Sequence, residues 1–274
     1  MWAAAIKQQK GLNMNIRYIT CSDPRNHNTH DEMFDLWKMD PRVEIAVQMH
    51  PGKVSPDTER YKWIRQLVDK ASQSSGNAPR LAVHVNNDWC DEICNGKIPG
   101  PLAFVFTTRN IDDFFPVVER IQLNIPQKTA DNFNPEKLKR VIDHFGDISF
   151  IIQYNNRTKG ATDKLYKTGA QFDLLFDESG GRGESPESWQ KPVYGPEHLQ
   201  GYAGGLKPET VGTELDKIVK VARNRDIWVD IEGGVQKPTG ELKPDGKPIK
   251  LFHAPFAAEY IRNTLAWEQK HRQK

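Results

Sequence analysis

The chain has 274 residues, of which 38 are basic and 36 are acidic, so its formal net charge is only +2. Because neither sign forms a long block, broad electrostatic binding to nucleic acid or to an anionic membrane is disfavoured. No apolar run approaches the roughly 20 residues that cross a bilayer, and three cysteines predict a reducing, cytoplasmic compartment rather than a disulfide framework.

Apolar, strand-like runs alternate with amphipathic stretches along almost the whole chain. Residues 1–14 are predicted to form a short N-terminal extension, and residues 15–274 a single domain. The expected strands are residues 16–21, 43–49, 80–85, 120–125, 148–154, 172–177, 199–204 and 227–232. Strands that alternate with helices predict parallel pairing, and eight such units predict a closed (β/α)8 TIM barrel with long loops after the sixth and eighth strands.

Helix starts and glycines support the closed barrel over an open sheet. Pro56, Pro135 and Pro208 occupy positions typical of a first helical turn, and residues 211–222 carry apolar residues at steps of three and four. An open, doubly wound sheet usually has a glycine-rich turn after its first strand. Here that strand leads into "TCSDPRN", and the glycines follow the last three strands, where barrels build anion sites.

Polar residues end most of the predicted strands, and barrel active sites lie at these carboxyl ends. The candidates are Cys21, His50, Asn86, Gln122, Asn124, Gln153, Asp177, Asp230 and Glu232. A single cysteine or aspartate at a strand end has structural explanations, as a buried apolar residue or as a helix cap. Together with the glycine turns 204–205 and 233–234, however, they predict an acid, a base and anion-binding loops at one mouth.

A metal site is disfavoured by the spacing of the potential ligands. Cys90 and Cys94 are separated by three residues and no second cysteine pair accompanies them, whereas a structural zinc ion needs four ligands. His50 has no metal-ligand partner at the second or fourth following position. A metal ion is therefore not expected.

Three consecutive motifs resemble those of phosphoribosylanthranilate isomerase, a TIM-barrel enzyme of tryptophan biosynthesis. They are "FDLLFDESGGRGESPESW", "YAGGLKPETV" and "WVDIEGGVQ", and upstream "YITCSDP" keeps the cysteine of that family's first strand. The resemblance implies a cofactor-free Amadori isomerisation of a small phosphorylated amino sugar, with Asp177 as the acid and Cys21 as the base. It also implies phosphate binding by Gly204, Gly205, Gly233 and Gly234, and places Lys53 nearest the family's substrate-binding arginine.

The sequence also departs from that family in its charges. Glu178 and Glu232 add carboxylates beside Asp177 and Asp230, which predicts a substrate other than the doubly anionic one. Lys53, Glu178, Asp230 and Glu232 are thus predicted to contact a different substrate. Two alternatives stay open. One is a hydrolase of sugars or nucleosides that uses two of the acids Asp177, Glu178, Asp230 and Glu232, and the other is a barrel that binds a phosphorylated ligand without catalysis.

Overall fold

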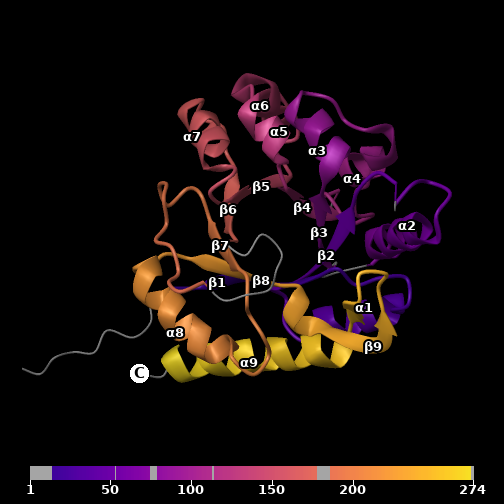
Figure 1. The fold of residues 1–274 in the computed structure, drawn as a ribbon, viewed down its shortest axis with the longest axis vertical. Coiled ribbons are helices and arrows are strands. Elements are labelled where there is room, and N and C mark those ends of the chain that lie inside the picture. The colour runs from indigo at the N-terminus through magenta and orange to yellow at the C-terminus, as the bar shows by residue number, and fades with distance from the viewer. Residues whose placement is uncertain (1–13, 53, 75–78, 113, 178–185, 273–274) are drawn as a thin grey trace, which may run out of the picture.

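The computed structural model describes residues 14–52, 54–74, 79–112, 114–177 and 186–272. Eight parallel strands form a closed barrel in chain order, with β8 paired to β1 (Figure 1). Their bounds are β1 Ile16–Ser22, β2 Val43–Met49, β3 Arg80–Val85, β4 Val118–Leu123, β5 Ser149–Tyr154, β6 Asp173–Phe176, β7 Gln200–Ala203 and β8 Ile227–Ile231. The predicted (β/α)8 barrel is confirmed.

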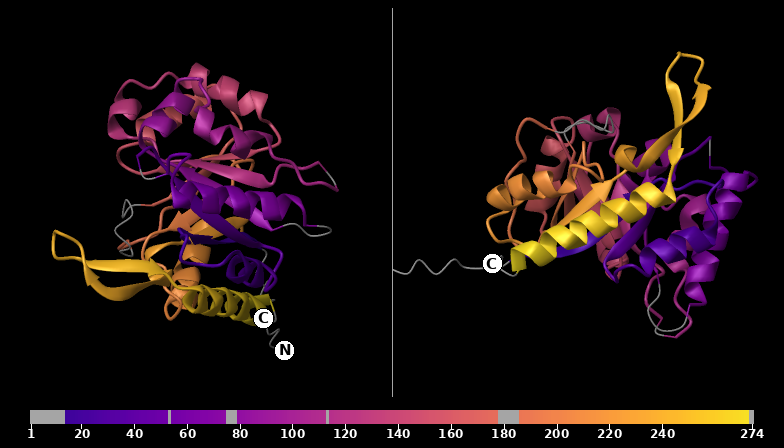
Figure 2. Two further views of the ribbon diagram at one scale, coloured as in Figure 1. Left: turned by 90° about the vertical axis from the view of Figure 1, so that its right-hand side faces the viewer. Right: turned by 90° about the horizontal axis from the view of Figure 1, so that it is seen from below.

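Helices surround the barrel on its outer side. They are α1 His30–Trp37, α2 Glu59–Ser72, α3 Asn87–Cys94, α4 Ala103–Thr107, α5 Gln127–Asp131, α6 Pro135–His144, α7 Lys159–Lys167, α8 Val211–Ala222 and α9 Ala254–Arg272, with short 3-10 turns η1 Gly100–Leu102 and η2 Gly233–Val235. The last helix, α9, packs on both α8 and α1 and so closes the ring (Figure 2). Among the described residues no helix is both long and apolar enough to span a membrane.

Side-chain caps define several helix starts, and of the three prolines predicted in a first helical turn, one lies there and two lie just before the helix. Pro135 is the first residue of α6, and Asn134 caps that helix by accepting a hydrogen bond from the Glu136 amide. Pro56 precedes α2, which begins after the cap Thr58. Pro208 likewise lies in the turn before α8.

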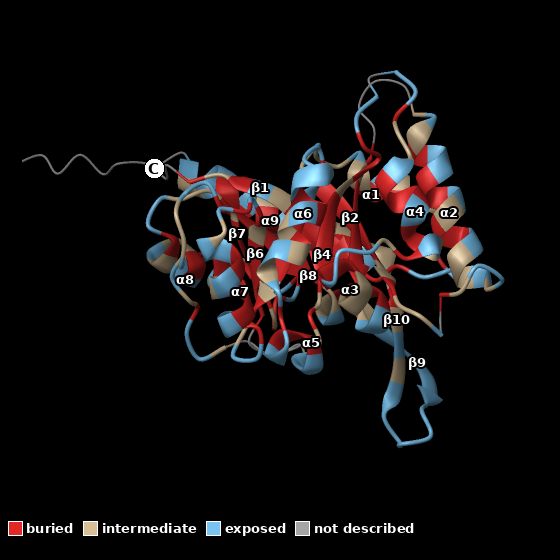
Figure 3. Cartoon of the chain, turned by 90° about the horizontal axis from the view of Figure 1, so that it is seen from above, coloured by how far each residue is buried: buried red, intermediate tan, exposed pale blue. Residues whose placement is uncertain are grey.

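The two long loops differ in structure. After β8, strands β9 Gln236–Leu242 and β10 Pro248–Phe252 pair as an antiparallel hairpin. The hairpin projects away from the barrel and is mostly exposed (Figure 3). Between β6 and β7 the described residues, 186–199, form no helix or strand. Of the predicted extension, Met14 is buried in the core, and residues 1–13 lie outside the described chain.

Strand register divides the residues of β1 between two faces. Thr20 pairs with Glu44 and Asp230, whereas Cys21 pairs with Ile45 and Ile231. Because neighbours in register point to the same face of a parallel sheet, Thr20 and Cys21 face opposite sides. Thr20 donates a 2.7 Å hydrogen bond to Glu44 inside the barrel. Cys21 therefore faces the helix layer.

A buried ion pair fills the middle of the barrel. Arg120 and Glu44 are both fully buried, and Arg120 Nη1 donates a 3.0 Å hydrogen bond to Glu44 Oε1. The guanidinium carbon of Arg120 lies 4.1 Å from the centre of the Tyr18 ring and 4.0 Å from that of Trp228. The two rings thus stack on the cation, which stabilises a charge that burial alone would disfavour.

Gly201 makes room for this arrangement. A Cβ atom at Gly201 would lie 2.0 Å from Cε2 of Trp228, far inside van der Waals contact. Only glycine lets the backbone of β7 pass so close to the indole ring.

Candidate functional site

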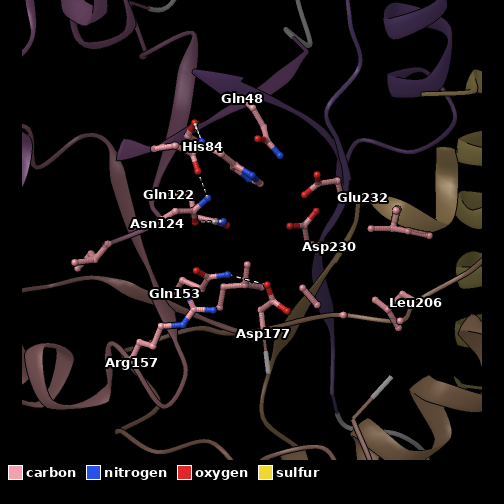
Figure 4. A pocket seen from close by; sticks show the side chains of 18 of the residues that line it. Gln48, His84, Gln122, Asn124, Gln153, Arg157, Asp177, Leu206, Asp230 and Glu232 are labelled. Atoms are coloured by element: carbon pink, nitrogen blue, oxygen red, sulfur yellow. Dashed lines mark hydrogen bonds between the residues drawn. The ribbon is translucent and has the colours of Figure 1, made fainter. Parts of the chain in front are cut away.

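A polar cavity of about 510 Å3 opens where the carboxyl ends of the strands meet (Figure 4). Seven amide side chains line it: Gln48, Asn86, Asn87, Gln122, Asn124, Gln127 and Gln153. Three carboxylic acids also line it, namely Asp177, Asp230 and Glu232. Among the described lining residues, exposed Arg157 supplies the one side chain that is cationic at neutral pH.

Most of the strand-end candidates meet in this cavity. Asn86, Gln122, Asn124, Gln153, Asp177, Asp230 and Glu232 line it together with Gly204, Gly205, Gly233 and Gly234. Cys21 and His50 do not line it. Lys53 and Glu178 lie outside the described residues.

The structure separates Cys21 from Asp177. Cys21 lies on the outer face of β1 and is fully buried, with its thiol near Tyr260 of α9. Burial raises the pKa of the Cys21 thiol, and the Asp230 carboxyl acts in the same direction. The nearby Arg25 pairs with Asp23, with 2.6 Å between Nη2 and Oδ2. The expectation of a Cys21 thiolate that acts with Asp177 does not fit this placement, because the strand alternation directs the two side chains to different sides of the barrel wall.

Asp177 and Asp230 reach the cavity through the same alternation. Leu175 and Trp228 pack in one cluster inside the barrel. Asp177 comes two residues after Leu175, and Asp230 two residues after Trp228, so both acids point to the same side of the barrel wall. Asp177 comes directly after β6, and Gln153 Nε2 donates a 2.7 Å hydrogen bond to its Oδ2. Figure 4 shows this pair on one side of the cavity, with Asp230 and Glu232 beside each other on another.

Asp230 is a carboxylic acid that keeps its proton at neutral pH. Burial raises the pKa of Asp230 to about 8, and the neighbouring carboxyls of Glu232, Glu44 and Asp177 act in the same direction. Ser22 Oγ, 2.5 Å from Asp230 Oδ1, forms a hydrogen bond that opposes the shift. At pH 7 the wall of the cavity thus holds a proton donor.

Glu232 lies half-buried next to Asp230. Burial raises the pKa of Glu232 to about 7, with further contributions from the carboxyls of Asp23 and Asp177. The facing Gln48 amide and the Arg25 guanidinium act in the opposite direction. The site therefore gains negative charge as the pH rises from about 7 to about 8.

The opposite wall is uncharged and joined by hydrogen bonds. Gln122 Nε2 donates to Asn124 Oδ1 at 2.9 Å, and Asn124 Nδ2 donates to Asn86 Oδ1 at 2.8 Å. Burial, helped by Arg120, lowers the pKa of His84 to about 3, so this ring is neutral. Within the described chain, His84 Nε2 and Gln122 Oε1 have no hydrogen-bond partner, an unmet polar requirement at the cavity wall.

The glycines of the last two loops have packing roles. Gly204 and Gly205 adopt φ angles of 94° and 73°, in the left-handed region that favours glycine. A Cβ atom at Gly234 would lie 2.2 Å from the carbonyl oxygen of Leu206, so the loops after β7 and β8 interlock. These requirements account for three of the four glycines without an anion.

Sequence reasoning missed Ser22 as the partner of Asp230. It also missed five polar lining residues: Gln48, His84, Asn87, Gln127 and Arg157. Gln48 and His84 carry a usable signal, because each is a polar residue that interrupts an otherwise apolar run. Arg157 lies in the loop after β5, where no pattern points to the cavity.

Comparison with known proteins identifies the fold and leaves the family open. No family model and no curated protein matches the sequence. Phosphoribosylanthranilate isomerase from Thermus thermophilus is similar in structure, with a TM-score of 0.51 and 14% identity over 91% of this chain and 98% of that chain. A family 39 glycoside hydrolase from Bacteroides cellulosilyticus WH2 gives a TM-score of 0.48 and 12% identity over 94% of this chain and 64% of that chain. At 14% identity, the likeness to the isomerase shows only that the chain has the TIM-barrel fold, which many enzymes share.

Proposed function

We propose that the chain is an acid–base enzyme that hydrolyses the glycosidic bond of a sugar or nucleoside. The observation that carries the proposal is Asp230, a buried carboxylic acid with a pKa of about 8 that faces the same cavity as Asp177. In this role Asp230 donates its proton to the leaving group as the glycosidic bond breaks. The Asp177 carboxylate either takes a proton from the water that attacks the sugar carbon, or attacks that carbon itself to form a glycosyl-enzyme that water then hydrolyses.

The cavity lining suits a neutral substrate rich in hydroxyl groups. Each amide side chain both donates and accepts hydrogen bonds, which matches a sugar hydroxyl. The neutral His84 ring can do the same. In the described lining the exposed Arg157 is the one cation, and Glu232 adds negative charge above about pH 7, which disfavours a multiply charged anion.

The roles of the two acids can be separated with leaving groups of different quality. Nitrophenyl glycosides and nucleosides are first screened for turnover by the wild-type chain. Asp230→Asn should lower kcat/KM on a poor leaving group by about 10²- to 10⁴-fold, the usual contribution of a general acid. The same variant should lower kcat/KM far less on a 2,4-dinitrophenyl leaving group, which departs without a proton. Asp177→Asn should lower it on both.

Exposed Asp143→Asn in α6 is the control for an acid-to-amide change and should keep wild-type rates. Equal losses for both leaving groups in Asp230→Asn would contradict its role as the acid. Lack of turnover on every glycoside and nucleoside, by a folded chain, would contradict the reaction class.

A second candidate is the isomerisation of a phosphorylated amino sugar by the same two acids. The observation that favours it is the convergence of the four glycines 204, 205, 233 and 234 on the cavity that holds Asp177. Incubation with phosphoribosylanthranilate distinguishes the candidates: formation of the Amadori product supports the isomerase, and its absence beside glycoside turnover supports the hydrolase.

A further inference from the structure

A second hollow of about 540 Å3 adjoins the cavity, beside the loops that follow β2, β3 and β4. Asn87 and Pro126 line both spaces. Asn87 is exposed and Pro126 only half-buried, so the rim that the two spaces share is open to solvent. A ligand that leaves the cavity on this side can therefore continue into the second hollow.

The hollow extends further between α3 and α5, which lie side by side at the barrel rim (Figure 1). A smaller space of about 110 Å3 shares Asp91, Lys128 and Thr129 with it. Thr129 Oγ1 donates a 2.8 Å hydrogen bond to Asp91 Oδ1, which ties the two helices together under the surface. We call the second hollow and this smaller space the side groove.

The lining of the side groove suits a polar, uncharged ligand. Asp88, Asp91, Lys128 and Thr129 offer carboxylate, ammonium and hydroxyl groups in the larger hollow, where the prolines 51 and 126 are the bulkiest apolar lining residues. An amphipathic peptide helix would need an apolar groove, which is missing from this described lining. Two acids against one lysine disfavour a polyanion such as a nucleic acid.

We propose that the side groove binds further sugar units of an oligosaccharide whose scissile bond lies in the cavity beside Asp177 and Asp230. This inference rests on the proposed glycosidic activity and adds the substrate class, a chain of several neutral sugars. The cavity and the larger hollow have similar volumes, about 510 and 540 Å3, so each has room for at least one unit.

Binding as a function of oligosaccharide length tests the proposal. β-1,4-linked gluco-oligosaccharides and α-1,4-linked malto-oligosaccharides of two to six units are titrated calorimetrically into the full chain that carries Asp177→Asn, which blocks turnover. The Kd should fall at least tenfold between two and four units in the series that binds. Adding Asp88→Ala and Lys128→Ala should remove at least fivefold of that gain and leave the Kd of the dimer unchanged.

Lys97→Ala, an exposed lysine beyond the end of α3, is the control and should preserve the full gain. Equal affinity for oligosaccharides of every length, or a gain in affinity with length that survives the double substitution, would overturn sugar binding in the side groove. Either result would leave the glycosidic proposal in place. A folded chain that binds no member of either series would overturn the groove and would also count against a sugar substrate.

Discussion

Asp230 makes the stability of the chain depend on pH in an unusual direction. Its folded pKa of about 8 lies above the value of about 3.9 for an unfolded aspartate. The folded state therefore holds the proton more tightly, and this contribution is complete below about pH 4 and is lost as the pH rises through about 8. Most surface acids behave oppositely, because their folded pKa is lowered.

Asp230→Asn should reduce this dependence. Relative to the wild-type chain, the variant should gain free energy of unfolding between pH 5 and pH 9, since the amide never acquires the buried charge. Urea unfolding at both pH values measures the difference. The control Asp131→Asn, at an exposed position in α5, should show the same change in free energy of unfolding with pH as the wild type. The same change in Asp230→Asn would contradict the raised pKa.

The Arg120–Glu44 pair predicts strong coupling between two buried residues. Arg120→Met should destabilise the chain by about 3–5 kcal/mol, because Glu44 then keeps a buried charge without its partner. The double variant that also carries Glu44→Leu should lie much closer to wild type. A double-mutant cycle by urea unfolding measures the coupling, and additive losses would show that the pair is not a unit.

The same Arg120→Met variant should raise the pKa of His84, since one of the two causes that lower it is removed. An NMR titration of the His84 ring follows this change and needs no substrate.

At the level of elements, β7 depends on a glycine that no helix or turn requires. Gly201→Ala should destabilise the chain by about 1–3 kcal/mol, the usual cost of overpacking, because the added methyl overlaps the Trp228 ring. Gly160→Ala in α7 is the control: it meets no atom within 4 Å and should stabilise its helix by up to about 1 kcal/mol. Thermal unfolding compares the two, and equal melting temperatures would contradict the packing argument.

For the whole molecule, the order of strands and helices could be predicted because apolar runs and amphipathic stretches alternate throughout the chain. Strand ends also predicted much of the cavity, including Asp177 and Asp230, because the fold brings those ends together. The sequence predicted less well to which side of the barrel wall each side chain points. Cys21 is one residue out of phase with the inward-facing set, and a one-residue shift in a strand moves a side chain through the barrel wall.

The remaining misses have a different physical origin. The sequence predicted a long loop after β8 but not its hairpin, because the pairing of β9 with β10 is specified only weakly by a short polar sequence. The pKa of Asp230 depends on burial and on acids from other strands, which are far apart in sequence.

The interlocked loops after β7 and β8 limit how this site can be altered. The carbonyl of Leu206 occupies the space that any side chain at position 234 would need. Any substitution at position 234 therefore forces the backbone of the loop after β7 to move, whatever the substitution does for the substrate. Changes in specificity on this side of the cavity have to keep Gly234 or rebuild the backbone of both loops together.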